Sequence, residues 1–310
     1  MKVLVTGGAG FIGSHVIEEL INYNFQVVSV DSYVTGSPFN VPEGVMMYEM
    51  DINHHGLESI FLKEKPDFVI HLAAQVSVIG SINNPYEDFY TNTAGTVNLL
   101  RLSTKYHVKK FLFASTAAVY GEPNYLPVDE IHPIETKSFY ALSKFSAENY
   151  IHQYGQLNNL DCCVFRFSNV YGPRQNANGE AGVVAIFVNG LLNNERVAIY
   201  GGNQTRDFIH VKDIAKACHL ALVRQVVGVF NLSSGTETTI TDLFKQIAEI
   251  ARVSKKPIYF PERNSEIQQS VLDNQKAYRV FDWKPKIQLS DGLLETVQYY
   301  AGLSSFELQR

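Results

Sequence analysis

The sequence is poor in cysteine and tryptophan, with 3 and 1 of these residues among 310. Cys162, Cys163 and Cys218 are too few and too unevenly spaced for a disulfide framework or a zinc site. We expect them to be core thiols in a reducing compartment, and we expect no bound metal.

Basic tracts and long apolar runs are also missing. The 26 basic and 31 acidic residues are spread along the chain and give a net charge of -5, so no segment suits nucleic acid or an anionic membrane surface. No apolar run approaches the roughly 20 residues of a membrane span, and a strand pattern begins at Lys2, where a signal peptide would lie. We therefore expect a cytoplasmic protein that binds neither nucleic acid nor membranes.

Hydrophobic residues, in contrast, make up 45% of the sequence, which is enough for a substantial core. In the first half, short β-branched runs alternate with longer segments whose apolar residues recur with a period near 3.6. This alternation is typical of βαβ units around a buried parallel sheet, and it predicts a doubly wound α/β fold of the Rossmann type. The strand-like runs include KVLVTG, QVVSVD, PDFVIH and KKFLFAS.

The second half of the chain interrupts this pattern. After Tyr171 the alternation loosens into GPRQNANGEAG, resumes at DFIHVKDIAKACHLAL and VGVFNLSSG, and ends in helix-like and Pro-containing segments. The interruptions predict a smaller, discontinuous second unit. We expect residues 1–170 and 208–236 to form the Rossmann domain, and residues 171–207 and 237–310 to form a C-terminal substrate domain.

A glycine-rich loop, VTGGAGFIGSH, follows the first predicted strand and opens the first predicted helix. Gly7, Gly10 and Gly13 permit a tight turn and a close approach of the backbone to a pyrophosphate, while the helix N-terminus supplies N–H donors. Asp31 ends the second strand, about 20 residues on, where a carboxylate can bind ribose hydroxyls and would repel a 2′-phosphate. The combination predicts a dinucleotide site that prefers NAD to NADP; the alternative is a structural turn with a solvated aspartate.

A second group of polar residues lies at the end of a later strand. Ser115 and Thr116 end KFLFAST, and Tyr140 and Lys144 open a predicted helix one turn apart on the same face. Ser115, Thr116 and Tyr140 can therefore converge at the carboxyl edge of the sheet, where α/β proteins bind ligands. A phenol titrates near pH 10 in isolation, but a nearby ammonium and a positive nicotinamide ring would favour the phenolate. Tyr140 is therefore a plausible catalytic base.

The Tyr-x-x-x-Lys spacing alone is weak evidence, because Tyr106 and Lys110 match it too. That second pair lies at the end of a predicted helix just before a strand, where we expect a surface pair.

These segments, in order along nearly the whole chain, resemble the motif series of the extended short-chain dehydrogenase/reductase family, in its NAD-dependent nucleotide-sugar epimerase and dehydratase branch. The segments are TGGAGFIGSH, MDI, HLAA, STAAVYG, YALSK, RFSNVYGPRQ and RDFIHVKD.

The resemblance implies a set of NAD-binding residues. In it, Asp51 and Ile52 contact adenine, Lys144 binds the nicotinamide ribose, and Asn92 helps to fix the central helix and the active-site water network; a core or capping role is the alternative for each. The complete set is Gly7, Gly10, Phe11, Ile12, Gly13, Asp31, Asp51, Ile52, Leu72, Ala73, Ala74, Asn92, Ser115, Tyr140 and Lys144.

The branch begins its reactions alike, with Tyr140 taking a proton from the sugar 4-hydroxyl while hydride passes to NAD. Related dehydratases carry Asp-Glu directly after the catalytic threonine, and UDP-glucuronate decarboxylases tend to carry a Glu there, whereas this chain has Ala117 and Ala118. Without a carboxylate to shuttle protons, the outcome implied is 4-epimerisation of a UDP-sugar through a 4-keto intermediate. Thr116 would bind the 4-oxygen and Ser115 would support the loop; a plain capping role is the alternative for Thr116.

The resemblance also implies a nucleotide-sugar site in the smaller domain. Asn169, Arg206 and Arg263 would bind the diphosphate, although an exposed arginine is more often a solvated surface charge. Tyr200 would stack on uracil and Glu266 would bind the ribose. The complete set is Ser77, Thr116, Asn169, Tyr200, Arg206, Arg263, Glu266 and Ser270.

Ser270 falls where related epimerases carry either a bulky aromatic or a small residue beside the sugar 2-substituent. A serine leaves room for an N-acetyl group, so we expect UDP-GlcNAc and UDP-GalNAc to be accepted, beside or instead of UDP-glucose and UDP-galactose. A glucuronate substrate is the alternative in which Arg174 binds a carboxylate.

Three other functions remain open from the sequence: a 4-keto-sugar reductase, a dehydratase or decarboxylase, and a non-catalytic nucleotide-binding regulator. The family's usual state is a homodimer formed through helices near residues 92–106 and 140–154, which we expect here.

Overall fold

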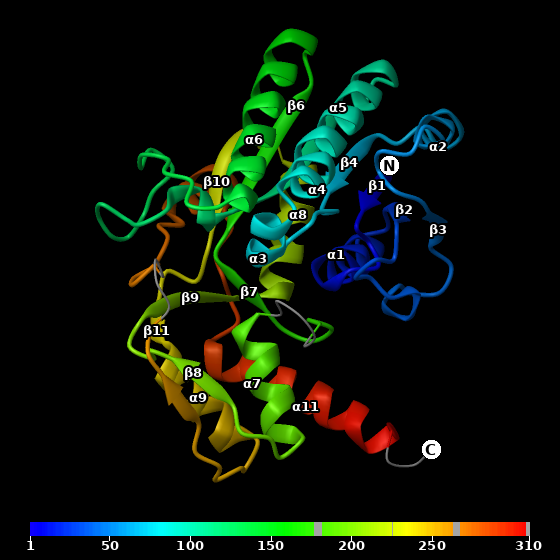
Figure 1. Cartoon of the computed structure of the whole chain (residues 1–310). Helices are drawn as coiled ribbons and strands as arrows, with labels where there is room; N and C mark the ends of the chain where they lie inside the picture. Colours follow the sequence, from blue (N-terminus) through cyan, green and yellow to red (C-terminus); the bar gives the residue numbers. More distant parts are fainter. Residues whose placement is uncertain (177–181, 225, 263–266, 308–310) are drawn as a thin grey trace.

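The structure is a computed structural model that describes residues 1–176, 182–224, 226–262 and 267–307. Its centre is a seven-stranded sheet in the order β10-β6-β5-β4-β1-β2-β3, in which all neighbouring strands are parallel. The predicted doubly wound α/β fold is confirmed (Figure 1). The strands are β1 (Lys2–Thr6), β2 (Gln26–Asp31), β3 (Met46–Glu49), β4 (Phe68–His71), β5 (Lys110–Thr116), β6 (Asp161–Phe167) and β10 (Gly228–Leu232).

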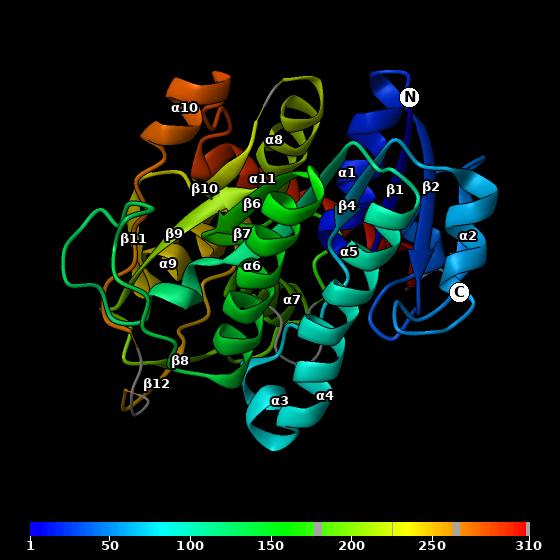
Figure 2. The ribbon, with the colours of Figure 1, turned by 90° about the horizontal axis from the view of Figure 1, so that it is seen from above.

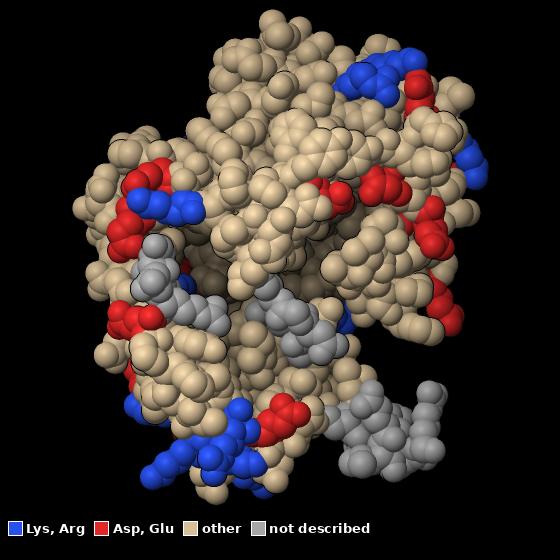
Figure 3. All heavy atoms as spheres, in the orientation of Figure 1, with Lys and Arg blue, Asp and Glu red and all other residues tan. Residues whose placement is uncertain are grey.

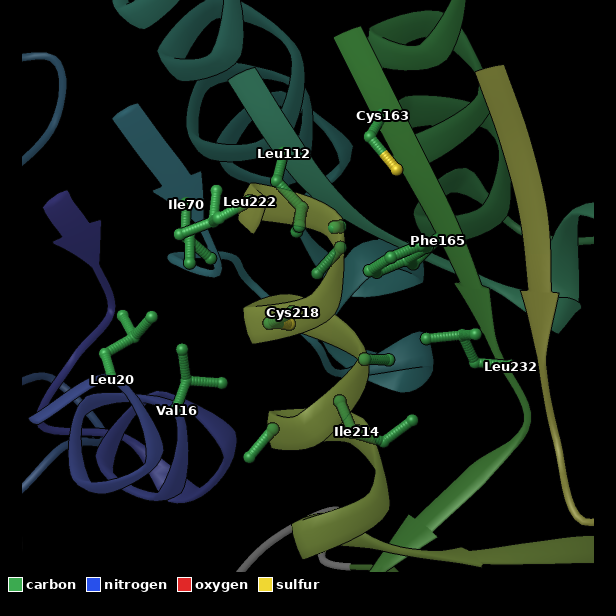
Figure 4. Packing of buried hydrophobic residues seen from close by; sticks show 14 of the residues in the cluster. Val16, Leu20, Ile70, Leu112, Cys163, Phe165, Ile214, Cys218, Leu222 and Leu232 are labelled. Atoms are coloured by element: carbon green, nitrogen blue, oxygen red, sulfur yellow. The ribbon is translucent and has the colours of Figure 1, made fainter. Parts of the chain in front are cut away.

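Alternate residues of each strand point to opposite faces of this sheet, and helices cover both faces. One core cluster joins Val3 and Val5 of β1 to α1 (Phe11–Asn22), α8 (Val211–Val223) and α10 (Gln275–Phe281). Figure 4 shows α8 at its centre, with Ile214, Cys218 and Leu222 directed at the sheet or α1.

The opposite face of the sheet carries a second core cluster. It joins Leu4 of β1 to α2 (Leu57–Glu64), α5 (Gly95–Lys105) and α6 (Phe139–Asn158). Figure 2 shows α5 and α6 side by side, with α3 (Val78–Asn83) and α4 (Pro85–Phe89) near their ends. A π-helix, η2 (Tyr90–Ala94), leads into α5, and two short 3-10 helices are η1 (Pro38–Asn40) and η3 (Ala117–Tyr120).

The smaller part of the molecule is built from two further sheets and three helices. β7 (Asn169–Tyr171), β9 (Thr205–His210) and β11 (Glu237–Thr239) form one sheet, and β8 (Ala198–Tyr200) and β12 (Ile258–Phe260) form the other. They pack with α7 (Val183–Leu192), α9 (Ile240–Ile250) and α11 (Leu289–Glu307) around a separate core cluster. The domain boundaries drawn from the sequence stay a prediction; α10, late in the chain, packs on the large sheet through Ala277 and Phe281.

Two expectations about single residues are decided by burial. All three cysteines are buried free thiols, as expected. The expected surface pair of Tyr106 and Lys110 is wrong, because Lys110 is 5% exposed. Its ammonium donates to the carbonyls of Ala221 at 2.8 Å and Arg224 at 2.7 Å, and so satisfies the C-terminal end of α8.

Among the described residues, none of the helices has the length and apolar character needed to cross a membrane.

Candidate active site

The predicted site residues gather at the carboxyl edge of the large sheet. Thr6 pairs in register with Val30 and His71, and His71 pairs with Phe113. The loops that follow β1, β2, β4 and β5 therefore all leave the sheet at the same edge. This edge includes the gap between β1 and β4 where the strand order reverses, which is where doubly wound sheets bind ligands.

The glycine loop is packed too tightly to carry side chains at its key positions. Gly7 has φ of +72°, and a Cβ there would lie 2.7 Å from the backbone nitrogen of Ala73. A Cβ on Gly13 would lie 2.0 Å from the carbonyl oxygen of Gly7. Gly10 is the N-cap of α1 and supplies no side-chain acceptor, so the first-turn N–H groups remain available to an anion. The loop thus fits a dinucleotide pyrophosphate.

Asp31 lies directly beside this loop. One carboxylate oxygen accepts from the backbone N–H of Ala9 at 2.9 Å and the other from that of Tyr33 at 2.8 Å. The carboxylate is buried, so it both orients the loop and presents a negative charge where a ribose would lie.

The remaining predicted cofactor residues differ in exposure. Ile52 is buried, and its side chain meets the backbone of Gly95, where a Cβ would lie only 2.5 Å from it. Asp51 is exposed and accepts from the N–H of Asn53 at 2.7 Å. The half-buried run Leu72, Ala73 and Ala74 follows β4 and faces the glycine loop; Phe11 and Ile12 are half-buried in the first turn of α1.

The predicted catalytic residues are brought together by β5 and α6. Ser138 caps α6 by accepting from the N–H of Ala141 at 3.1 Å, which places Tyr140 in the first turn. The Tyr140 phenol lies close enough to Thr116, the last residue of β5, for the Thr116 side chain to favour the phenolate. Lys144 is 3% exposed, and its ammonium donates to the carbonyl of Ala114 at 2.9 Å. The start of α6 therefore lies against the end of β5, as predicted.

Burial controls the protonation of both groups in the protein without ligand. It raises the pKa of Tyr140 to about 12, an effect that the hydrogen bond with Thr116 offsets in part and the charge of Asp88 reinforces. Burial lowers the pKa of Lys144 to about 8, while the carboxylates of Asp88 and Glu148 oppose that change. At neutral pH, Tyr140 holds its proton and Lys144 is mostly charged.

Asn92, expected to fix the central helix, is the centre of a buried amide network. It bonds the backbone N–H and carbonyl of Gln75 at 2.9 and 3.0 Å. Its amide also donates to Asp88 at 3.1 Å and to the hydroxyl of Ser143 at 3.1 Å. Sequence reasoning missed Gln75 and Asp88, because neither belongs to a motif that was singled out.

Ser115 is held by a second network, whose other members sequence reasoning also missed. Its hydroxyl donates to Glu148, which pairs with Arg166 at 2.6 Å. Arg166 in turn donates to the Tyr120 hydroxyl at 3.0 Å. Since Glu148 lies one helical turn beyond Lys144, a charged residue on the buried face of α6 was a readable signal of this pair. The network holds the end of β5 in place through Ser115.

Figure 3 shows a hollow between the two parts of the molecule. Three of the predicted substrate residues, Asn169, Tyr200 and Arg206, belong to β7, β8 and β9 of the smaller part. The Tyr200 ring stacks on Phe260, with ring centroids 5.2 Å apart. Arg206 donates to the carbonyls of Thr205 and Ile267, both at 2.8 Å. Asn169 lines a small cavity together with Val183 and other residues at the start of α7.

Local structure defines the surroundings of two further predicted substrate residues. Ser77 caps α3 by accepting from the N–H of Gly80 at 2.6 Å. Ser270 is half-buried and precedes Val271, whose carbonyl accepts from the N–H of Val128 at 2.9 Å. Arg263 and Glu266 lie outside the described residues, so their predicted roles stay predictions.

Residues 3–233 match the model of the NAD dependent epimerase/dehydratase family. The chain belongs to this family. It is similar to a UDP-glucose 4-epimerase from Thermotoga maritima solved with UDP-glucose, at 41% identity and a TM-score of 0.95, covering 98% of this chain and 100% of that one. It is also similar to a Thermus thermophilus UDP-glucose 4-epimerase solved with NAD, at 39% identity and a TM-score of 0.92, covering 97% and 99% of the two chains.

A third likeness is to a UDP-N-acetylglucosamine 4-epimerase from Methanobrevibacter ruminantium, solved in complex with UDP-N-acetylmuramic acid. The identity is 34% and the TM-score 0.93, covering 97% of this chain and 98% of that chain. The predicted family and its NAD cofactor are thus confirmed.

The glycine loop yields a test of the cofactor site. Gly13→Ala should purify with little or no NAD and bind added NAD at least about tenfold more weakly, because its Cβ would displace the Gly7 carbonyl and open the loop. NAD content can be measured after acid release. Gly302→Ala in α11, where a Cβ would meet nothing within 4 Å, is the control and should keep the wild-type content. Full NAD retention in Gly13→Ala would contradict the assignment.

Proposed function

We propose that this protein interconverts UDP-sugars that differ in configuration at C4, with NAD restored in each turnover. The observation that carries the proposal is the convergence of Thr116, Tyr140 and Lys144 at the sheet edge beside the glycine loop. It occurs in a chain whose structural relatives include 4-epimerases of UDP-glucose and UDP-N-acetylglucosamine. The sequence prediction of a UDP-sugar 4-epimerase, an isomerase, agrees with these likenesses.

Proton transfer at the sugar 4-oxygen is the task of Tyr140 and Thr116. NAD, when bound, supplies the acceptor and later the donor of hydride at C4. Tyr140 takes the 4-hydroxyl proton as C4 is oxidised to a ketone, and it returns that proton after the keto sugar has turned its other face. Thr116, whose side chain acts on the same phenol, holds the 4-oxygen in line.

A phenolate is needed at neutral pH, although burial raises the pKa of Tyr140 to about 12. The ammonium of Lys144 and the positive charge of an oxidised nicotinamide both favour the anion. Tyr140 therefore gains its basicity when the cofactor is bound, which confines proton abstraction to the loaded enzyme.

Alternative reactions of the branch lack their proton shuttle here. Ala117 and Ala118 open η3 directly after Thr116, at the positions where dehydratases and decarboxylases would need a carboxylate. Elimination or decarboxylation of the 4-keto sugar is therefore disfavoured, and return of hydride to the other face is the remaining outcome.

A glucuronate substrate is disfavoured by the environment of Arg174. Its guanidinium binds both carboxylate oxygens of Glu18, at 2.6 and 2.7 Å, and the imidazole of His15 at 2.8 Å. Because these partners take up the in-plane N–H donors of the guanidinium, Arg174 ties the loop after β7 to α1 and is not offered to a substrate carboxylate.

The substrate is held between the two parts of the molecule, with the smaller part taking the nucleotide. Arg206 and Asn169 would bind the diphosphate, and Tyr200, backed by Phe260, would stack on uracil. The first-turn N–H groups of α7 offer further donors, since its N-cap, Gly182, has no side chain to accept from them.

A cytoplasmic location and a homodimer complete the proposal. α4 and α6 carry exposed apolar residues close to one another, among them Tyr86, Phe89, Leu142 and Tyr150. A second copy packing its own α4 and α6 against these side chains would remove them from water.

Two alternatives use the same residues differently. A 4-keto-sugar reductase would consume reduced cofactor stoichiometrically, and a nucleotide-binding regulator would bind substrate without changing it. Asp31 argues against NADPH, and the retention of both Tyr140 and Lys144 argues against lost catalysis.

The decisive assay incubates the purified protein, with no added cofactor, with UDP-GlcNAc and separately with UDP-glucose, and follows the anomeric protons by NMR. We expect the galacto epimer to appear and to increase until an equilibrium mixture is reached. Tyr140→Phe should lower the rate by about 10²- to 10⁴-fold while keeping its NAD content, because only the proton carrier is lost. If neither sugar changed even with NAD supplied, the proposal would fail.

Sugar selectivity is tested at Ser270. Ser270→Tyr should lower kcat/KM for UDP-GlcNAc by at least about tenfold and leave that for UDP-glucose within about threefold, because the ring would fill the space of the N-acetyl group. Gln269→Tyr places the same ring on the exposed neighbour and should change neither value. Full activity of Ser270→Tyr on UDP-GlcNAc would contradict the prediction that Ser270 leaves room for the N-acetyl group.

The oligomeric state is tested by analytical ultracentrifugation at micromolar concentration. We expect a dimer for the wild type and a monomer for Leu142→Glu combined with Tyr150→Glu, because each charge would be buried without a partner. A wild-type protein that sedimented only as a monomer would refute the homodimer.

A further inference from the structure

Asp88 is a buried carboxylate that the catalytic scheme above does not use. It is 1% exposed and belongs to α4, which packs against α6. One of its oxygens accepts from the side-chain amides of Gln75 at 2.9 Å and Asn92 at 3.1 Å. The other is buried and has no hydrogen-bond partner among the residues that the structure describes. A buried carboxylate with one oxygen unpaired is costly unless a charge compensates it.

The charge available to compensate Asp88 is the Lys144 ammonium, on the helix against which α4 packs. Asn92 joins Asp88 to the Ser143 hydroxyl at 3.1 Å, and Ser143 bonds the Tyr140 carbonyl at 3.1 Å. Asp88 is thereby fixed beside the turn that carries Tyr140 and Lys144, and its charge acts on both residues. Neither Asp88 nor Lys144 has a direct ion-pair partner within 4 Å in the described parts of the chain.

Of the other titratable groups around Lys144, Glu148 also raises the pKa of that ammonium, but this carboxylate has a cation of its own. Glu148 is already paired with Arg166 at 2.6 Å and accepts from Ser115. His71 is fully buried between Thr6 and Thr96, and burial holds its pKa well below the usual value, so it is neutral. The remaining carboxylate of α4, Glu87, is exposed.

We propose that Asp88 is a positioning residue for the reaction: its buried carboxylate is the counter-charge of Lys144 and fixes the α6 turn that carries Tyr140. This inference rests on the roles proposed above for Tyr140 and Lys144. Burial raises the pKa of Asp88, while the nearby Ser143 hydroxyl and the Lys144 charge oppose the rise. The Asp88 anion in turn keeps Lys144 protonated.

The charge of Asp88 should shift the pH profile of the reaction in a definite direction. A negative charge raises the pKa of any neighbouring group, so Asp88 raises the pKa of both Tyr140 and Lys144. Protonation of Tyr140 limits the activity on the acid side of the profile, and deprotonation of Lys144 limits it on the alkaline side. Removing it should move both limbs of the profile in the same direction, to lower pH.

The kinetic test compares kcat for UDP-glucose epimerisation between pH 5 and 10 in the wild type, Asp88→Asn and Glu87→Gln. Asparagine keeps the shape and the acceptor oxygen for Gln75 and Asn92. In Asp88→Asn both limbs should fall by about one pH unit, whereas Glu87→Gln, which removes a neighbouring exposed charge, should leave them in place. A uniform loss of kcat with unmoved limbs would show a merely structural role and overturn the inference.

A second test needs no catalysis. Urea unfolding at pH 7 is measured for Asp88→Asn in the wild-type background and in Lys144→Met. If the two charges stabilise each other, Asp88→Asn should lower the unfolding midpoint in the wild type and leave it unchanged or raise it in Lys144→Met. Equal losses in both backgrounds would overturn the inference. The unfolding test decides the role of Asp88 even if the protein turns over neither sugar. The lack of turnover would contradict the proposed function but not this inference.

Discussion

Every group of the candidate site depends on the parallel register of β1, β2, β4 and β5. Val30, Thr6, His71 and Phe113 lie in one row across the sheet, so the four loops that follow this row leave the sheet together. Parallel strands require crossover connections, usually helices, on both faces, and these helices bury most of the sheet, the edge strand β3 excepted. The same constraint places the N-terminus of α1 beside the glycine loop and the N-terminus of α6 beside the end of β5.

Burial then sets the chemistry of the charged groups under that edge. Arg166 and Glu148 pair below Ser115, and Lys144 lies above Phe113 with its ammonium on a backbone carbonyl. Charges removed from water need partners or lose their protonation. His71 accordingly stays neutral, while Lys144 keeps its charge at neutral pH although burial lowers its pKa to about 8. These buried residues therefore support Tyr140, the proton-transfer group, which is half-buried at the more exposed edge of the site.

Sequence reasoning predicted the residues whose function requires a special local pattern. Glycines at Gly7 and Gly13 follow from a turn that excludes a Cβ, and Tyr140 and Lys144 follow from a helical spacing placed after a strand end. Residues that act through distant partners left no such pattern. Gln75, Asp88 and Ser143 come from three separate segments, and Lys110 repeats the Tyr-x-x-x-Lys spacing yet caps α8 from the other end of the sheet.

The sequence by itself determined the α/β class, the glycine loop with its answering Asp31, and the order of the motifs, because periodicity and turn chemistry are local properties. Only the tertiary structure decided which polar side chains are buried together: Asp88 beside the Tyr140 turn, Glu148 on Arg166, and Arg174 on Glu18 rather than free for a ligand. Burial and pairing depend on the packing of elements far apart in the chain. They therefore set the protonation of the site in ways that no single segment encodes.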